Sequence, residues 1–455
     1  MKRIAVLFLI AALAALLPAP PVRAVPAETI RIDPGVTLIV SRQAQIPLVS
    51  IVILLRGGTL FEPAAKAGVA SVTTELLQRG TRAHPGEQYV TALDAIGAKI
   101  GVDASADMIT VTFSSLTSRM DEALSLLEEM LVDPTFAPAD FEKVRAEAIA
   151  SLKASEEDPG FIASRAFIQA LYGDHPYGRL VEGSEPTLRA LTREDCVAFW
   201  KKVAGARGAT ITAAGDVTAS DLAARVKRRL PRWLARPGDP LPEPPKVPPP
   251  PAGARLITID RPLTQTTLVV GEQGIARLDP DYFALEVWNF VLGGGGFSSR
   301  LVDEIRDNRG LAYSVHSAFE ARLLPGPFDI RLETKNRTAR QALDLLRVEV
   351  ARAISLGVTP KELQDAQAYL TGSYPRRYDT NDEMARFLAA TAFYGLGTDY
   401  DQVYPRKIRA VTPKDVARAA KAHVHPDRFL VVAVGKTAES GLRSNRASPT
   451  PARRR

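Results

Sequence analysis

The chain has 455 residues, of which 46% are apolar and 24% are charged, a composition typical of globular proteins rather than of disordered or multispan membrane proteins. A single cysteine, Cys196, excludes any intrachain disulfide and any metal site built from several cysteines. The net charge of +7 comes from the two ends, because residues 1–24 carry +3 and residues 437–455 carry +4. The body of the chain is therefore neutral, which argues against a nucleic-acid-binding face.

Residues 1–24 have the form of a secretory signal peptide. A basic start is followed by an apolar run over 4–17, which is short for a membrane span. Small residues, Val22 and Ala24, occupy the third and first positions before a cleavage point after Ala24. We expect a periplasmic or otherwise exported protein with no stable membrane span once the signal is removed. An uncleaved anchor is the alternative interpretation.

The next segment alternates strand and helix patterns. Apolar residues alternate with threonines over 109–113, which predicts a strand with one buried face. Apolar residues at helical spacing over 120–131 predict a helix, and a second helix is expected from about 138 to 154. A helix-start pattern at 192–195 then precedes a helix and a strand over 209–215.

A proline-rich segment, residues 236–253, divides the chain. It reads RPGDPLPEPPKVPPPPAG, which neither a helix nor a sheet interior accommodates, and we interpret it as an extended linker. After it the same order of patterns returns: a strand over 328–332, a helix over 339–350 and another helix from Pro360.

The two halves are copies of each other. Matching residues lie 220 positions apart in three pairs: Thr192 and Thr412, Asp195 and Asp415, and Gly215 and Gly435. We therefore predict two homologous α+β domains, each a mostly antiparallel sheet with helices packed on one face. The predicted organisation is a signal peptide over 1–24, an N-terminal domain over 25–235, a linker over 236–253, a C-terminal domain over 254–436 and a disordered basic tail over 437–455.

A glycine-rich segment, GGGGFSSRL, joins two predicted helices of the second half. Its four glycines allow the backbone to approach a partner closely, and Ser298 or Ser299 is available to cap the second helix. The segment lacks the lysine and the strand context of a phosphate-binding loop. The alternative interpretation is a hinge between two helices. The glycines are Gly293, Gly294, Gly295 and Gly296.

Several of these features together resemble one family. The two-copy layout, the helix over 68–81 that ends in Gly-Thr, the segment YGDHPYG over 172–178 and the glycine-rich segment resemble the pitrilysin, or insulinase, family of zinc metallopeptidases, which includes insulin-degrading enzyme and mitochondrial processing peptidase. The resemblance covers residues 35–436. Active members carry His-x-x-Glu-His in the helix, where two imidazoles hold zinc and the glutamate acts as base, and a later glutamate completes the ligands.

This chain departs from the family's zinc motif. Aligning the motif places its first histidine at Ser71, its glutamate at Thr74 and its second histidine at Glu75. The later glutamate falls at Ser151, or at Ala150 if the alignment shifts by one. Hydroxyl groups are poor zinc ligands and poor bases near neutral pH. The resemblance therefore implies a member with no catalytic residue and no metal of its own, and places zinc in a partner subunit.

Other side chains offer weak alternatives for a metal site. Glu147 lies one turn before the expected position of the later glutamate, and His84 follows the degenerate helix in sequence. His423 and His425 form the only closely spaced histidine pair, at a predicted helix end, and there a cap and a surface residue are the more common outcome.

The second half retains the substrate-side residues that the resemblance implies. In the family an arginine, followed seven residues later by a tyrosine, contacts the substrate and the carbonyl under attack, and these positions correspond to Arg306 and Tyr313. Both roles are chemically reasonable, because a guanidinium binds carbonyl or carboxylate oxygens and a phenol donates to an oxyanion. The resemblance further implies that the glycine-rich segment admits substrate.

We therefore expect a substrate-binding subunit of an exported heteromeric zinc peptidase that is inactive alone. Its expected partners are a zinc-bearing pitrilysin-like subunit and unfolded or extended peptides, which add as a strand to a sheet edge. A peptide-binding or scaffold protein with no proteolytic role is the main alternative. An independently active peptidase requires a metal site that the sequence does not reveal.

Overall fold

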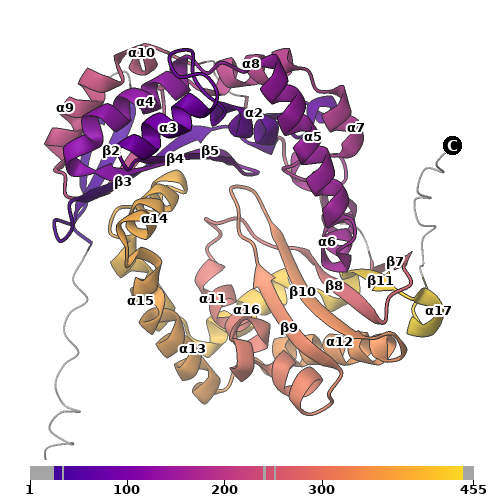
Figure 1. The fold of residues 1–455 in the computed structure, drawn as a ribbon. Helices are drawn as coiled ribbons and strands as arrows, with labels where there is room; N and C mark the ends of the chain where they lie inside the picture. Colours follow the sequence, from indigo (N-terminus) through magenta and orange to yellow (C-terminus); the bar gives the residue numbers. More distant parts are fainter. Residues whose placement is uncertain (1–24, 33–34, 239–241, 251–252, 444–455) are drawn as a thin grey trace, which may run out of the picture.

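A computed structural model describes residues 25–32, 35–238, 242–250 and 253–443, and these form two α+β halves (Figure 1). The predicted signal peptide lies outside the described residues, as do residues 444–455 of the predicted tail. None of the helices in the described ranges is both long and apolar enough to span a membrane.

The first half is a six-stranded sheet with helices. Its strands are β1 (Glu28–Ile32), β2 (Val36–Arg42), β3 (Leu48–Arg56), β4 (Lys99–Ala104), β5 (Met108–Leu116) and β6 (Thr210–Gly215). They lie in the order β1-β2-β6-β3-β5-β4, with only the β2–β6 pair parallel. Its helices are α2 (Val69–Leu77), α3 (Glu87–Ala95), α4 (Met120–Val132), α5 (Pro138–Ser155), α6 (Pro159–Tyr172), α7 (Glu185–Ala190), α8 (Arg193–Val203), α9 (Ala219–Arg229) and α10 (Pro231–Leu234).

The second half repeats this plan with five strands. They are β7 (Arg255–Asp260), β8 (Gln265–Gln273), β9 (Ala312–Phe319), β10 (Pro327–Lys335) and β11 (Leu430–Gly435). Their order, β7-β11-β8-β10-β9, matches that of the first sheet from β2 onward, and the one parallel pair, β7–β11, occupies the equivalent place. Its helices are α11 (Tyr282–Asn289), α12 (Ala339–Leu356), α13 (Pro360–Gly372), α14 (Asn381–Phe393), α15 (Tyr400–Ala410), α16 (Pro413–His423) and α17 (Thr437–Ser440).

Local patterns explain these elements, and the predicted two-domain α+β fold is confirmed. Ile109, Val111 and Phe113 of β5 are buried while the threonines between them are half-buried. The hydroxyls of Thr192 and Thr412 each accept from the main-chain amide of the aspartate three residues on, and the amide of each threonine donates back to that aspartate's carboxylate. The matching offset therefore marks structurally equivalent helix starts.

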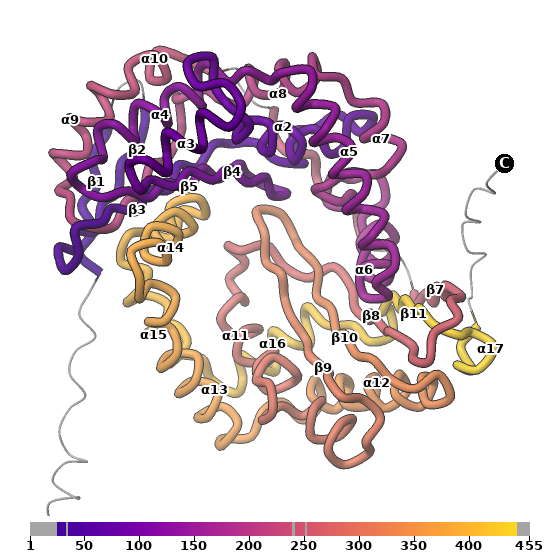
Figure 2. Tube along the Cα trace, in the orientation of Figure 1, coloured from indigo at the N-terminus to yellow at the C-terminus, as the bar shows by residue number. Residues whose placement is uncertain are grey.

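The two halves exchange helices. Each sheet packs most of its own helices on one face, but α14 of the second half lies against β3 and β6, and α6 of the first half lies against β8 and β11 (Figure 2). The expectation of helices on one face is therefore correct for each half's own core and incomplete for the whole chain. The exchange makes each half part of the other's core.

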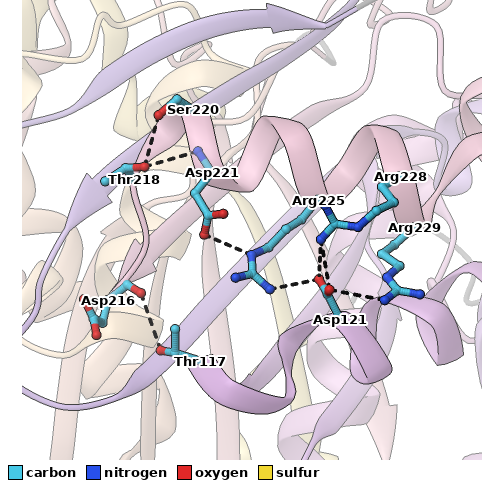
Figure 3. Close-up of polar contacts among 9 residues, drawn as sticks. All are labelled: Thr117, Asp121, Asp216, Thr218, Ser220, Asp221, Arg225, Arg228 and Arg229. Carbon is cyan, nitrogen blue, oxygen red and sulfur yellow. Dashed lines mark hydrogen bonds and ion pairs between the residues drawn. The ribbon is translucent and has the colours of Figure 1, made fainter.

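An arginine cluster fastens α9 to the start of α4. Figure 3 shows the Asp121 carboxylate accepting hydrogen bonds from Arg225, Arg228 and Arg229, at 2.9, 2.9 and 3.2 Å. Burial raises the pKa of Asp121, but the three arginines outweigh that effect and hold it below its ordinary value. The three arginines of α9 are thus paired with a carboxylate inside the fold, in keeping with the neutral body predicted from sequence.

The linker and the C-terminal boundary are more tightly bound than a free spacer and tail. The Pro245 carbonyl lies 3.0 Å from Nε2 of His175, and Gln273 donates to the Pro248 carbonyl at 2.9 Å. Residues 437–440 form α17, and Leu442 is buried in the second-half core. The predicted start of the disordered tail at 437 is therefore wrong, because an apolar contact and α17 keep this stretch on the protein.

Candidate functional site

The degenerate zinc positions lie on α2 and α5, which pack together. Thr74 is buried, and its hydroxyl donates to the main-chain oxygen of Ser71 at 2.9 Å. Glu75 and Ser151 are exposed. One carboxylate and hydroxyls that bond locally do not make the three-ligand set that a catalytic zinc requires, so the residues here do not fit the metal.

The alternative donors are engaged elsewhere. Glu147 accepts from Arg79 at 3.0 Å, and His84 Nδ1 lies 2.8 Å from Glu129. Both side chains therefore face partners other than Glu75, and neither completes a ligand set with it.

The two histidines at the end of α16 contact different carboxylates. His423 Nε2 lies 3.0 Å from Asp281, and His425 Nδ1 lies 3.2 Å from Glu272. Asp279, Asp281 and His423 form the single group of three potential metal ligands among the described residues. Asp281 already accepts two hydrogen bonds from Arg418, so a guanidinium neutralises the carboxylate that a cation would need.

A buried glutamate holds the start of α2. Glu62 accepts hydrogen bonds from the amides of Gly68, at 3.2 Å, and Ala70, at 2.6 Å. These amides belong to the helix N-terminus, whose free N–H groups favour an acceptor. Burial nevertheless dominates and raises the pKa of Glu62 to about 7. The glutamate thus has a structural role at the base of the degenerate helix.

The glycine-rich segment begins inside one π-helical turn, Phe290–Gly294, and ends just before another, Val302–Asp307. Such turns are rare and are frequent at functional sites. Gly293 packs so closely on β9 that a Cβ atom there would lie 2.6 Å from the Ser317 hydroxyl. Gly296 has φ +60° and faces open space, so it is the glycine positioned to meet another molecule.

The serines of this segment do not cap the following helix as predicted. The Ser298 hydroxyl donates to the Gly295 carbonyl at 3.1 Å, and the Ser299 hydroxyl donates to the Gly296 carbonyl at 2.7 Å. A hydroxyl aimed backward at a carbonyl tightens the loop instead of accepting from the helix amides. The N-cap prediction is therefore wrong.

Arg300 anchors the end of the segment to α13. It donates two 2.7 Å hydrogen bonds to Glu362 and a third, at 2.9 Å, to the Gly357 carbonyl. Burial raises the pKa of Glu362, but the bonds from Arg300 and Thr359 prevail and lower it to about 2. A paired, two-pronged contact of this kind fixes orientation as well as position.

Arg306 and Tyr313 come together beside this segment, and Phe297 joins them. The Arg306 guanidinium lies 4.8 Å from the centre of the Phe297 ring and 5.6 Å from the centre of the Tyr313 ring. Both rings are largely exposed, at 79% for Phe297 and 86% for Tyr313. We call these three residues the aromatic–arginine cluster. Its rings gain little from folding, because they bury almost no area.

Backbone irregularity directs Tyr313 outward. Leu332 of β10 pairs with Val315, whereas Thr334 pairs with Ala312, so Tyr313 and Ser314 face one residue of the neighbouring strand. This extra residue is a β-bulge, a feature that redirects side chains and recurs near binding sites. β9 is also an edge strand of its sheet.

A pocket of about 380 Å³ opens beside Tyr313, between α6 and the second sheet. Its lining includes Ser164 of α6, His316 of β9 and Arg331 of β10. Arg331 donates to Ser164 at 3.0 Å, so the pocket wall is built from both halves. The pocket therefore depends on the helix exchange.

The segment 172–178, quoted for the resemblance, joins the halves. The Tyr172 hydroxyl donates to the Pro325 carbonyl at 3.1 Å, and the Tyr177 hydroxyl accepts from the Leu324 amide at 3.2 Å. His175 Nδ1 accepts from the Tyr177 amide, so its proton is on Nε2, toward the linker carbonyl. Burial lowers the pKa of His175, which keeps it in this neutral form.

Sequence comparisons place both halves in one family. The family model described as Insulinase (Peptidase family M16) matches residues 38–185, and the one described as Peptidase M16 inactive domain matches residues 190–370. The chain belongs to the M16 peptidase family. Within it, this chain is a member that lacks the His-x-x-Glu-His motif.

Relatives and solved structures of the M16 family agree with this placement. The chain is 26% identical over 387 residues to a Helicobacter pylori protein named non-peptidase homolog YmxG, covering 83% of this chain and 87% of that one. It is 28% identical over 372 residues to an uncharacterized zinc protease of Streptomyces coelicolor, covering 80% of each. A crystal structure titled peptidase M16 inactive domain, from Pseudomonas fluorescens, superposes with a TM-score of 0.85 at 29% identity, covering 90% of this chain and 98% of that one.

The two M16 matches separate the features of the site. The degenerate positions fall in the first match, and the glycine-rich segment and the aromatic–arginine cluster fall in the second. Sequence reasoning missed Phe297, although a large aromatic residue inside a loop of glycines and serines is a signal in itself. Such loops have no core to bury a ring, so the ring is left for solvent or a partner.

Proposed function

We propose that this M16 chain is a non-catalytic, substrate-binding subunit of an exported heteromeric zinc peptidase. One observation supports it above the others: Arg306 contacts two exposed aromatic rings, while the helix that holds zinc in active relatives has no histidine. The chain thus keeps a surface suited to a peptide and lacks the means to cleave it. The zinc belongs to a partner chain of the same family.

Each member of the cluster has a separate role. The Arg306 guanidinium, whose nearest carboxylate is Asp307 at 3.8 Å, binds a carbonyl or carboxylate oxygen of the peptide. The Tyr313 hydroxyl donates to the oxygen that gains charge during hydrolysis at the partner's zinc. Phe297 holds the guanidinium from one side and covers an apolar side chain of the substrate.

The edge strand gives the peptide a path. An extended peptide that adds to β9 forms main-chain hydrogen bonds along it and passes Tyr313. The neighbouring pocket then receives one side chain of the peptide, beside the hydrogen bond that joins Arg331 to Ser164. Main-chain bonding dominates in this mode, so we expect loose sequence preference.

The test is a three-way assay with an internally quenched peptide library. Cleavage is measured for this chain alone, for a zinc-bearing M16 chain from the same organism alone, and for their mixture. We expect cleavage in the mixture well above the sum of the two separate rates. Cell fractionation of the tagged chain, with the periplasm as the expected compartment, tests export.

Variants assign the site. Arg306→Ala and Tyr313→Phe are each expected to lower kcat/KM of the mixture by about 10²-fold, the scale for loss of one donor to a developing charge. Arg309→Ala removes an exposed arginine three residues from Arg306 and is expected to change it less than about twofold. Chelator-sensitive cleavage by this chain alone contradicts the division of roles, and unchanged activity in both variants contradicts the site.

The same assay decides the alternative, a peptide-binding or scaffold protein. The name of the Helicobacter relative, non-peptidase homolog, is a reason to retain this alternative. Peptide binding by this chain that depends on Arg306, with no effect on cleavage by any zinc-bearing M16 partner, supports that alternative.

A further inference from the structure

Asp401, in the first turn of α15, is a fully buried carboxylate. Its Oδ2 accepts a hydrogen bond of 2.8 Å from the main-chain nitrogen of Val25, and its Oδ1 has no hydrogen-bond partner among the described residues. Nor does any lysine, arginine or histidine in the described ranges lie within ion-pairing distance of it. The carboxylate therefore has a single, uncharged hydrogen-bond donor in this part of the chain, although two buried oxygens that share a negative charge require further donors or a cation.

A second buried oxygen near Asp401 also lacks a hydrogen-bond partner among the residues that the structure describes. The hydroxyl of Tyr378, buried nearby, also has no hydrogen-bond partner in the described part of the chain. The Asp401 charge and, more strongly, burial raise the pKa of that hydroxyl. A buried carboxylate without a cation is costly, typically several kcal/mol, although the N-terminus of α15 supplies part of the compensation. An unpartnered Asp401 oxygen, beside a hydroxyl close enough for its pKa to respond to the Asp401 charge, indicates a missing donor.

The main-chain nitrogen of Val25 lies at the predicted cleavage point of the leader. The leader pattern predicts cleavage after Ala24, which makes Val25 the first residue of the processed chain. Hydrolysis of that peptide bond by water leaves a carboxylate on Ala24 and an amine on Val25, which takes up a proton because an α-amino group has a pKa of about 7.7–8. One N–H thereby becomes an ammonium with three.

We propose that Val25 is the N-terminus of the mature chain and that Asp401 binds its α-ammonium in a buried ion pair, so that removal of the leader completes the fold. The inference rests on the leader interpretation and does not depend on the proposed peptidase role. One N–H group of the ammonium binds Oδ2, and the other two are available for Oδ1 and its surroundings. Val25 is itself 8% exposed, with its side chain in the second-half core, so the terminus is already inserted.

The proposed ion pair between Val25 and Asp401 links the two halves. Val25 precedes β1 of the first half, whereas Asp401 belongs to the second half. The ion pair therefore ties the start of the first sheet to α15, next to the exchanged helix α14. An unprocessed chain offers one amide in the same place and leaves the Asp401 charge unbalanced.

The experiment uses the full chain expressed with export and purified from the periplasm. Trypsin releases residues 25–31, VPAETIR, from a chain that starts at Val25, and residues 24–31 from an unprocessed chain, because Arg23 precedes Ala24. This peptide contains no lysine, so an amine-reactive label on it reports the α-amino group alone. The folded protein is labelled at pH 7, and the label on 25–31 is compared with that in urea-unfolded protein.

We expect a start at Val25 and labelling at least about tenfold slower in the folded protein than in urea. Asp401→Asn is expected to abolish most of that protection, and Asp399→Asn, an exposed aspartate two residues away, to retain it. In a chain whose cleavage is blocked by Ala24→Tyr, Asp401→Asn should no longer lower the thermal midpoint. A different N-terminus, or equal labelling of folded and unfolded wild type, overturns the proposal even if Asp401→Asn fails to fold.

Discussion

Thr212 in the central strand β6 of the first half donates a 2.7 Å hydrogen bond to the main-chain oxygen of Ala385 in α14 of the second half. The bond is buried, and it lies where one half's helix covers the other half's sheet. Residues 173 positions apart in sequence thus share one core, although a proline-rich linker separates their halves. The halves are therefore expected to unfold as one cooperative unit.

Thr212→Val tests this coupling. The substitution keeps the β-branched shape and leaves the Ala385 oxygen with one donor fewer, so we expect a loss of about 1–2 kcal/mol in the free energy of unfolding. Urea unfolding, followed by tryptophan fluorescence and by circular dichroism, should still give coincident single transitions. Thr210→Val, on the same strand and half-buried, is the control and should cost less. Two separated transitions in the wild type would contradict the shared core.

Arg300→Lys tests the anchor of the glycine-rich segment. Lysine keeps the charge but not the paired bonds to Glu362 or the bond to Gly357, so we expect a loss of about 2 kcal/mol at pH 7. Because the folded pKa of Glu362, about 2, lies below its ordinary 4.5, the stabilisation is present above pH 4.5 and is lost as pH falls toward 2. The difference between wild type and variant should therefore shrink at pH 3. Arg340→Lys, in an exposed pair with Asp344, should show a small difference at both pH values.

Glu62 should make stability fall with rising pH. Its folded pKa of about 7 exceeds the ordinary 4.5, so the folded state binds more protons than the unfolded state between these values and loses stability as pH rises through them. Relative to wild type, Glu62→Gln should therefore gain up to about 3 kcal/mol between pH 4.5 and pH 8. Unfolding free energies at several pH values measure this, with exposed Glu75→Gln as the control. A constant difference across the range would show that Glu62 is ionised throughout.

The sequence predicted what depends on neighbours along the chain. The alternation in β5, the paired starts at Thr192 and Thr412, and the order of elements follow from local periodicity and capping, which act over a few residues. The helix exchange could not be predicted, because an apolar stripe on α14 shows that a face is buried but not which sheet buries it.

The same distinction explains the site. The alignment located Arg306 and Tyr313, but their contact with each other and that of Arg306 with Phe297 depend on the π-helical turns and the bulge in β9, which are irregularities that periodicity does not encode. The buried carboxylate of Asp401 was likewise invisible, since an aspartate in the first turn of a helix is usually a surface residue. Its role follows from contacts with a segment far away in sequence.

Zinc should neither bind tightly to this chain nor stabilise it. The degenerate positions offer one exposed carboxylate at Glu75, and a single carboxylate does not retain zinc against dialysis. Elemental analysis after dialysis against zinc and then metal-free buffer should find far less than one zinc per chain. The thermal midpoint should be the same with and without chelator. Stoichiometric zinc that is lost in Glu75→Ala would overturn the assignment of this helix as degenerate.

Tyr177→Phe should loosen the β9–β10 hairpin tip. The Tyr177 hydroxyl donates to Asp107 and accepts from the Leu324 amide, while the second Asp107 oxygen accepts from Leu323 at 3.2 Å. Without the hydroxyl, the buried Asp107 carboxylate and the Leu324 amide each lose a partner, so opening of the tip becomes easier by about 1–2 kcal/mol. Hydrogen exchange at the tip amides, followed by mass spectrometry of peptides covering 320–326, should accelerate by about tenfold, while exchange in β3 and β6 stays unchanged.

Tyr369→Phe removes the hydroxyl of an exposed tyrosine on α13 and should leave the tip as in wild type. Unaltered exchange in Tyr177→Phe would mean that the hairpin is held by its strands alone, and that the segment 172–178 is not what joins the two halves at this point.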